Sequence, residues 1–257
     1  MNNISALAFD LDGTIYNGNS PVKGALDTVA RLRSLNYKIF YFTNNSAKTC
    51  RQIVDKLNRL GFPAKQQNTY CASSAILTYL LEKKIKSIYL IASKELQDEL
   101  AASKIKIKDS SRVSAVVVGL DPFFNYNKLA VALEAINKGA KLIVANMDPS
   151  YPIENNRRMP GSGAIVGAIA AAAMHQPDFI VGKPSAYMLK LLCKDHGLLP
   201  AEVCIVGDSP ESDIAMANKL RCRSILFDPD DRFPGFLGNK VRNYCEIIPL
   251  ISTIKKG

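Results

Sequence analysis

The chain has 257 residues, of which 47% are hydrophobic and 22% are charged, and this balance excludes a largely disordered protein. Its formal net charge is +10, but lysine and arginine are scattered along the chain, which favours a solvated basic surface over a nucleic-acid-binding site. The longest run of small apolar residues, 164–174, is too short to span a bilayer. From the scattered charge and the short apolar run together, we expect a soluble protein that binds neither nucleic acid nor membranes.

The N-terminal segment alternates between strand-like and helix-like patterns. Short apolar runs predict strands, and apolar residues that recur every three or four positions predict helices. Ser46 can cap the start of the second helix, and Gly61 can end it. The order strand, helix, strand, helix is typical of a parallel sheet covered by helices. The predicted strands are 6–10 and 38–45, and the predicted helices are 21–36 and 46–61.

The middle of the chain carries a second series of the same kind. Its strand-like runs alternate with helix-like runs, and no linker rich in proline, glycine or serine separates it from its neighbours. An insertion of this size within a sheet domain predicts a separate module. The predicted strands are 87–93, 113–120 and 141–148, and the predicted helices are 94–104, 126–139 and 161–174.

The C-terminal segment returns to the first scheme, with predicted strands at 178–184, 202–208 and 222–228 and predicted helices at 185–196 and 212–220. Both ends of the chain therefore read as halves of one doubly wound sheet. The expected fold class is α/β, a doubly wound parallel-sheet core of Rossmann-like type with an inserted α/β cap domain. We expect the core domain over residues 1–70 and 177–257, and the cap over 71–176.

The cysteine and histidine residues do not form a metal-binding pattern. None of the six cysteines belongs to a CxxC pair, and several lie in apolar runs, as expected of reduced core thiols. His175 and His196 lie near the polar ends of predicted helices, without the spacing of a zinc site. The N-terminus shows neither a charged leader nor an apolar segment of signal length, so we expect a cytoplasmic protein.

Unusual polar residues follow four of the predicted strands. In open α/β sheets, ligands bind beyond the carboxyl ends of the strands. Each residue alone has an ordinary explanation as a helix cap, a turn former or a solvated lysine, but four such strand ends together predict a ligand site. The residues are Asp10 and Asp12 after the first strand, Thr43, Asn44 and Asn45 after the second, Lys183 after "DFIVG", and Asp208 after "EVCIVG".

These residue types suit phosphoryl chemistry. Asp10 and Asp12 provide two carboxylates at one strand end, so one can attack while the other moves protons. Gly13 lets the backbone turn closely and offer N–H groups to an anion. Lys183 contributes a positive charge that can neutralise phosphoryl oxygens. Asp10 and Asp208 form a hard pair of oxygen ligands that suits Mg²⁺.

Four motifs in order, "DLDGT", "TNN", the lysine of "VGKP" and "GDSPESD", resemble those of the haloacid dehalogenase superfamily of phosphohydrolases. The middle segment, with "VVVGLDPFFNYNKLAVALEAINKGAKLIVANMD" followed by "PGSGAIVGAI", is similar to the large cap of subclass IIA. That subclass includes NagD-like proteins and the p-nitrophenyl, phosphoglycolate and pyridoxal phosphate phosphatases. The resemblance covers nearly the whole chain.

The resemblance implies a role for each matching residue. Asp10 would be the nucleophile that forms an aspartyl-phosphate, and Asp12 would protonate the leaving oxygen and later activate water. Mg²⁺ would be held by the Asp10 and Asp208 carboxylates and the Asp12 backbone carbonyl. Asp213 would orient a metal-bound water or the lysine. The residues implied to line the phosphate pocket are Thr43, Asn44, Asn45 and Lys183.

Two positions depart from the usual pattern of the family. Relatives commonly have threonine before the last aspartate of the fourth motif, where this chain has Ser212 and keeps the hydroxyl group. In the cap, relatives often have threonine before asparagine, where this chain has Ala145 before Asn146. Asn146, Asp148 and Tyr151 are the candidates for selecting the substrate, although polar residues after a strand are commonly turn formers.

The expected function is hydrolysis of a small phosphorylated metabolite by a Mg²⁺-dependent phosphatase with a mobile cap. A phospho-ligand-binding protein without activity is the alternative from another class, and the presence of both Asp10 and Asp12 speaks against it. A phosphotransferase that shares the aspartyl-phosphate step is a further alternative. Sugar phosphates, phosphoglycolate, nucleoside monophosphates and pyridoxal phosphate all fit a cap of this kind. Because relatives often form homodimers through the cap, the resemblance also implies a possible homodimer.

Overall fold

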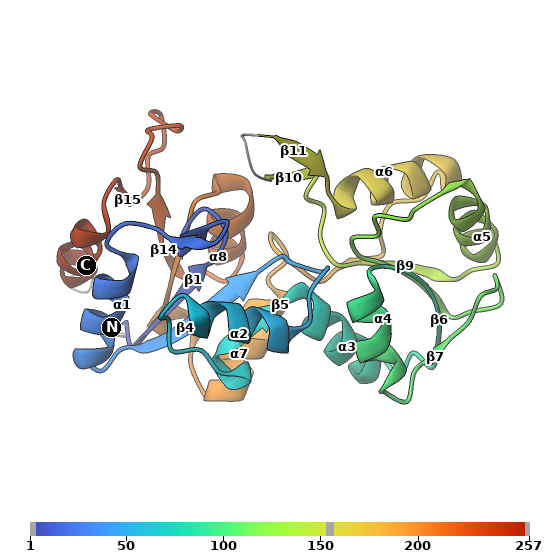
Figure 1. Ribbon diagram of the computed structural model, residues 1–257, viewed down its shortest axis with the longest axis horizontal. Helices are drawn as coiled ribbons and strands as arrows, with labels where there is room; N and C mark the ends of the chain where they lie inside the picture. The colour runs from blue at the N-terminus through green and yellow to red at the C-terminus, as the bar shows by residue number, and fades with distance from the viewer. Residues whose placement is uncertain (1–3, 153–156, 255–257) are drawn as a thin grey trace. The chain divides into compact units, whose positions relative to one another are not determined.

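The computed structural model describes residues 4–152 and 157–254. These form two compact units (Figure 1). The first unit takes in the described residues up to Thr43, then Val54–Tyr70 and the residues from Lys183 onward. The second takes in Asn44–Ile53 and Cys71–Gly182.

The first unit is built on a six-stranded sheet with the strand order β15-β14-β13-β1-β4-β5. The strands β4, β1, β13, β14 and β15 pair in parallel along this order. The two central strands, β1 and β13, are buried along their whole length because helices cover the sheet. The strands are β1 (Ala6–Asp10), β4 (Lys38–Thr43), β5 (Thr69–Cys71), β13 (Val203–Gly207), β14 (Arg223–Phe227) and β15 (Lys240–Val241).

Helices of the first unit bury one apolar side each. In α1, Val29 and Leu32 are buried, and α7 is followed by Gly197, which adopts the left-handed conformation common after a helix C-terminus. The helices are α1 (Ala25–Ser34), α7 (Tyr187–His196), α8 (Ala215–Lys219) and α9 (Ile247–Ile254), and α2 (Cys50–Arg59) is divided between the two units. Turns of 3₁₀ helix lie at Gln66–Asn68, Pro200–Glu202 and Tyr244–Glu246.

Two features at the carboxyl ends of the central strands β1 and β13 differ from the regular alternation of strands and helices. A small antiparallel hairpin, β2 (Tyr16–Asn17) with β3 (Ser20–Pro21), follows β1 closely. Before α8, residues Pro210–Ile214 form a π-helical turn in place of the first turn of the predicted helix 212–220. The wider turn brings the Asp213 carboxylate against Gly207, where an added Cβ would lie 2.2 Å from Asp213 Cγ.

The second unit contains a five-stranded sheet with the order β12-β9-β8-β6-β7, in which all pairings are parallel. Helices α5 and α6 lie on one face and α3 and α4 on the other (Figure 1). The strands are β6 (Ser87–Ile91), β7 (Lys106–Ile107), β8 (Ala115–Val118), β9 (Lys141–Val144) and β12 (Phe179–Ile180). The helices are α3 (Ala72–Glu82), α4 (Lys94–Ala101), α5 (Tyr126–Asn137) and α6 (Ser162–Ala173), and a hairpin joins β10 (Ser150–Pro152) to β11 (Arg158–Pro160).

The strand predicted over 178–184 belongs to this second sheet, so its assignment to the core sheet is wrong. β12 pairs with β9, and the Phe179 ring stacks on Tyr79 with centroids 3.9 Å apart. These contacts hold the partly buried apolar strand in the second unit, and the chain returns to the first unit at Lys183.

The predicted fold class is confirmed, because a parallel α/β core carries an inserted α/β unit. The predicted domain boundaries stay a prediction, and the compact second unit differs from them by including residues 44–53 and 177–182. Within the described ranges, no helix combines the length and the apolar character needed to cross a membrane.

Candidate active site

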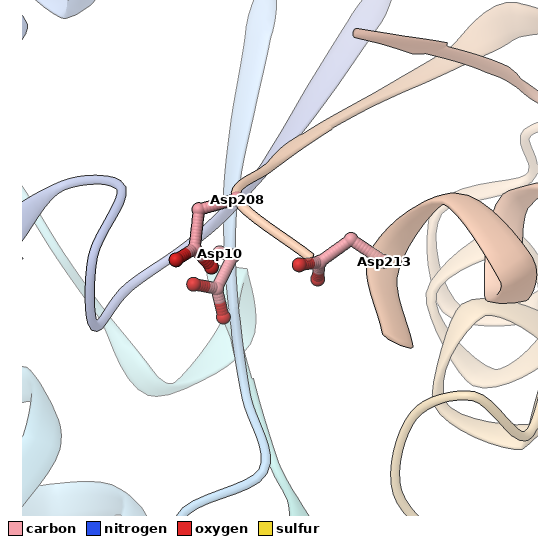
Figure 2. A group of neighbouring side chains, drawn as sticks. All are labelled: Asp10, Asp208 and Asp213. Carbon is pink, nitrogen blue, oxygen red and sulfur yellow. The ribbon is translucent and has the colours of Figure 1, made fainter. Parts of the chain in front are cut away.

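Three carboxylates meet at the carboxyl end of the core sheet (Figure 2). Asp10 ends β1, and Asp208 follows its neighbour β13, so parallel pairing of the two strands places the residues side by side. Asp213 comes from the π-helical turn. One carboxylate oxygen of each residue lies within 4.8 Å of the other two.

Lys183 is the cation at the centre of this group. Its Nζ forms an ion pair with Asp10 Oδ1 and a second with Asp213 Oδ1 at 2.7 Å. Only 3% of Lys183, 6% of Asp10 and 1% of Asp213 are exposed, so water cannot substitute for these partners. The structure therefore brings Lys183 and Asp10 together, as the strand-end pattern predicts.

Burial determines the proton affinities of the group. Burial raises the pKa of Asp10 well above its usual range. The positive charge of Lys183 acts in the opposite direction, whereas the negative charges of Asp213 and Asp208 raise this pKa further. Burial likewise raises the pKa of Asp208. Burial alone would lower the pKa of Lys183, but the charges of Asp10 and Asp213 outweigh it and raise this pKa. The lysine therefore carries a full charge.

The donor set fits a divalent metal ion. It consists of carboxylate oxygens alone, which hard cations such as Mg²⁺ prefer. Three carboxyl groups face the two cationic groups of Lys183 and Arg232, so the site holds more acidic than basic side chains. The backbone of Gly13 packs closely against the Asp208 carboxylate, because a Cβ at this position would lie 2.6 Å from Asp208 Oδ2 and clash with it.

Asp12 lies beside this group and not within it. Its side chain is exposed, and its Oδ2 accepts a hydrogen bond of 3.2 Å from the Tyr16 hydroxyl. The turn that carries it is closed by a hydrogen bond of 2.9 Å from the Gly13 N–H to the Tyr16 carbonyl. An exposed carboxylate so close to the buried Asp10 is placed for proton exchange with a bound molecule.

Sequence reasoning did not assign three residues that contact the site. The Thr14 hydroxyl donates to Asp10 Oδ2 at 3.3 Å, and Tyr244 donates to the Thr14 carbonyl at 2.7 Å. Arg232 Nη2 donates to Asp208 Oδ2 at 3.0 Å and to its carbonyl at 3.1 Å. Thr14 lies inside the motif "DLDGT" and could have been found there.

The residues of "TNN" are divided between the two compact units. Thr43 ends β4 in the first unit and is buried. Asn44 belongs to the second unit, where its Nδ2 donates to Asp148 and its carbonyl accepts from Asn146 Nδ2 at 2.7 Å. Asn45 Oδ1 accepts from the N–H groups of residues 47 and 48 and so closes a turn.

The three cap candidates all lie in the second unit. Asn146 is buried, and its Oδ1 accepts from the Asp148 N–H at 3.0 Å. Tyr151 lies in β10 opposite Met159 of β11. Asn146 and Asp148 therefore hold the segment that begins at Asn44, in addition to any role in recognition.

Comparison with known proteins gives a consistent result. The family model for haloacid dehalogenase-like hydrolases matches residues 7–106, and a related hydrolase model matches residues 180–229. An acid sugar phosphatase from Staphylococcus saprophyticus is 34% identical over 215 residues, which are 83% of this chain and 82% of the relative.

Solved structures agree with this match. A p-nitrophenyl phosphatase from Archaeoglobus fulgidus superposes with a TM-score of 0.83 at 25% identity and covers 99% of this chain and 94% of its own. A glycerol phosphate phosphatase from Mycobacterium tuberculosis, solved in complex with calcium, has a TM-score of 0.78 at 27% identity, covering 87% of this chain and 66% of its own.

Proposed function

The chain belongs to the haloacid dehalogenase-like hydrolase family, and we propose that it hydrolyses a small phosphorylated metabolite through an aspartyl-phosphate on Asp10. The family predicted from the four motifs is confirmed. The protein is a hydrolase of phosphate monoesters, in keeping with the phosphatases among its relatives. The observation that carries the proposal is the buried Asp10 carboxylate, held by Lys183 and Thr14, with the exposed Asp12 two residues away.

The first step is attack on phosphorus. A carboxylate oxygen of Asp10 forms the new bond to phosphorus while the bond to the ester oxygen breaks. Asp12 gives a proton to the departing alcohol, and Lys183 neutralises charge on the phosphoryl oxygens. Thr43, buried at the end of the adjacent strand β4, supports the phosphate with its hydroxyl group.

The second step regenerates Asp10. Asp12, now deprotonated, takes a proton from water, and the oxygen of that water attacks phosphorus. The bond between phosphorus and Asp10 breaks, and inorganic phosphate leaves. Asp213 acts through Lys183, because its carboxylate holds the ammonium group beside Asp10 throughout.

Mg²⁺ is the metal that we propose for this site. The Asp10 and Asp208 carboxylates and the Asp12 backbone carbonyl would hold it, while Arg232 supports Asp208. When bound, the ion supplies positive charge to the phosphoryl oxygens. The calcium complex of the Mycobacterium enzyme shows a divalent ion in that relative.

The remaining assignments are proposals for substrate contacts. Asn44 and Asn45 follow Thr43 directly in the chain and would add N–H and amide groups to the phosphate pocket. Asn146, Asp148 and Tyr151 of the second unit would contribute to substrate choice. A homodimer formed through the second unit, and a cytoplasmic location, stay predictions.

Phosphate release tests the proposed function. The purified protein is assayed with Mg²⁺ on a panel of sugar, glycerol, nucleoside and p-nitrophenyl phosphates, beside an Asp10→Asn variant and an EDTA-treated sample. We expect release that is lost in both controls, because the amide is a poor nucleophile and EDTA removes the metal. The absence of release from every ester would contradict the proposal, and alcohol released without equal phosphate would identify a phosphotransferase.

A further inference from the structure

The loop after β1 folds Tyr16 back onto Asp12. The Leu11 carbonyl accepts hydrogen bonds from the N–H groups of Thr14, Ile15 and Tyr16, at 3.2, 2.8 and 3.1 Å. Together with the bond from the Gly13 N–H to the Tyr16 carbonyl, these contacts define the loop closely. The position of Tyr16 relative to Asp12 is therefore fixed by the backbone.

The Tyr16 side chain is buried, and its hydroxyl group contacts the exposed residue Asp12. Tyr16 is only 3% exposed, and its hydroxyl donates to Asp12 Oδ2 at 3.2 Å. On the other side, the ammonium of Lys56 from α2 lies 3.5 Å from the centroid of the ring. A cation over an aromatic ring is an attractive contact, so Lys56 holds the ring in place.

We propose that Tyr16 is a positioning residue for the proton transfer by Asp12, with Lys56 as its support. The inference rests on the proposed function, in which Asp12 protonates the leaving alcohol. An exposed aspartate samples several rotamers, and a proton donor contributes only when it is held within reach of the accepting atom. The hydrogen bond from Tyr16 restricts the Asp12 carboxylate to one orientation.

The leaving group separates a positioning role from a structural role. A departing alkoxide needs a proton, whereas p-nitrophenolate is stable enough to leave without one. If Tyr16 only shaped the loop, its removal would slow the attack by Asp10 on every ester to the same degree. If Tyr16 positions Asp12, its removal slows the alkyl ester selectively.

The test compares Tyr16→Phe with Tyr41→Phe, both in Mg²⁺-loaded protein. Tyr41 lies in strand β4, which pairs with β1. Within the described residues its buried hydroxyl group has no hydrogen-bond partner, so Tyr41→Phe controls for the loss of a phenol hydroxyl group that makes no hydrogen bond. We expect kcat/KM of Tyr16→Phe to fall about tenfold for glycerol phosphate and less than about twofold for p-nitrophenyl phosphate, since one hydrogen bond to a charged group is lost. Tyr41→Phe should match the wild type on both esters.

A second variant keeps the inference testable if thermal unfolding shows that Tyr16→Phe is much less stable than the wild type. Lys56→Met retains the phenol and removes the cation over its ring, and it should show the same selective loss at smaller size. Equal losses on the two esters, or no loss on glycerol phosphate, would overturn the inference alone while the wild type stays active. A wild type inactive on both esters would overturn the proposed function and this inference with it.

Discussion

Lys183 is the residue on which the geometry of the site depends. It forms ion pairs with Asp10 and Asp213, and all three residues are almost fully buried. A buried carboxylate without its partner is far more costly than an exposed one, because no water replaces the lost charge. Lys183 therefore contributes to the stability of the core as well as to the chemistry that we propose for the site.

Replacement of Lys183 by methionine tests this dual role. We expect Lys183→Met to lose phosphatase activity and to lower the free energy of unfolding by about 3–5 kcal/mol, because two buried carboxylates lose their cation. Lys94→Met is the matched control, since Lys94 pairs with Asp98 on the surface, and it should change stability by less than about 1 kcal/mol. Urea unfolding measures both. A loss below about 1 kcal/mol for Lys183→Met would show that the ion pairs do not stabilise the fold.

Sequence reasoning found the site residues that lie at strand ends and missed those that reach the site from distant loops. Asp10, Lys183 and Asp208 each follow an apolar run, so their positions could be read from the pattern. Arg232 lies in a loop after β14 and Tyr244 begins a short 3₁₀ helix after β15, and nothing in their local sequence points to Asp208 or to Thr14. Contacts between residues so far apart in the chain depend on tertiary packing, which a single sequence does not show.

At the scale of elements, the turn after β1 determines how closely Asp208 approaches the first strand. Gly13 has a φ of +88°, which side-chain-bearing residues rarely adopt, and a Cβ there would lie 2.6 Å from Asp208 Oδ2. The turn therefore needs glycine for its conformation and for the space beside the carboxylate.

The variant Gly13→Ala separates these two requirements when it is compared with Gly139→Ala. Gly139 has a φ of +91° and nothing within 4 Å of its added Cβ, so Gly139→Ala carries the backbone strain alone, about 1–2 kcal/mol. We expect Gly13→Ala to cost more stability, to weaken Mg²⁺ binding measured by calorimetry, and to lose activity. Equal stabilities and unaltered Mg²⁺ binding would mean that Asp208 adapts without cost.

The turn after β9 connects two segments of the second unit. Asn146 is buried, donates to the Asn44 carbonyl and accepts from the Asp148 N–H, so it joins the turn to the segment that follows β4. A role in holding this segment is distinct from selecting a substrate.

The variant Asn146→Ala distinguishes the two roles. It removes the Asn146 hydrogen bonds from a buried carbonyl and from a partly buried N–H, and we expect a loss of about 1–3 kcal/mol in unfolding free energy. Because we also propose that Asn146 contributes to substrate choice, we expect the ratio of kcat/KM values for two esters to shift, whereas the exposed Asn127→Ala in α5 should change neither quantity. A ratio that stays as in the wild type would show that Asn146 holds this segment without selecting the substrate.

For the whole molecule, the alternation of strand-like and helix-like runs was sufficient to predict two α/β units with parallel sheets, one of them inserted in the chain of the other. The division between them was harder to predict, because it follows long-range hydrogen bonds. Ser46 contacts Ser162 at 3.2 Å and the Leu120 N–H at 3.1 Å, and these bonds draw residues 44–53 into the second unit. A local pattern cannot show which sheet a short segment such as β12 joins.

The most direct test of the account is to trap the phosphoryl group on the protein. The variant Asp12→Asn is mixed with p-nitrophenyl phosphate and Mg²⁺, quenched in acid and mapped by peptide mass spectrometry. Since this ester needs little protonation to leave while the second step needs a base, we predict a burst of p-nitrophenol and one phosphoryl group on the peptide that contains Asp10. A burst without phosphorylated protein, or a phosphoryl group on a different residue, would contradict the assignment of Asp10 as the nucleophile.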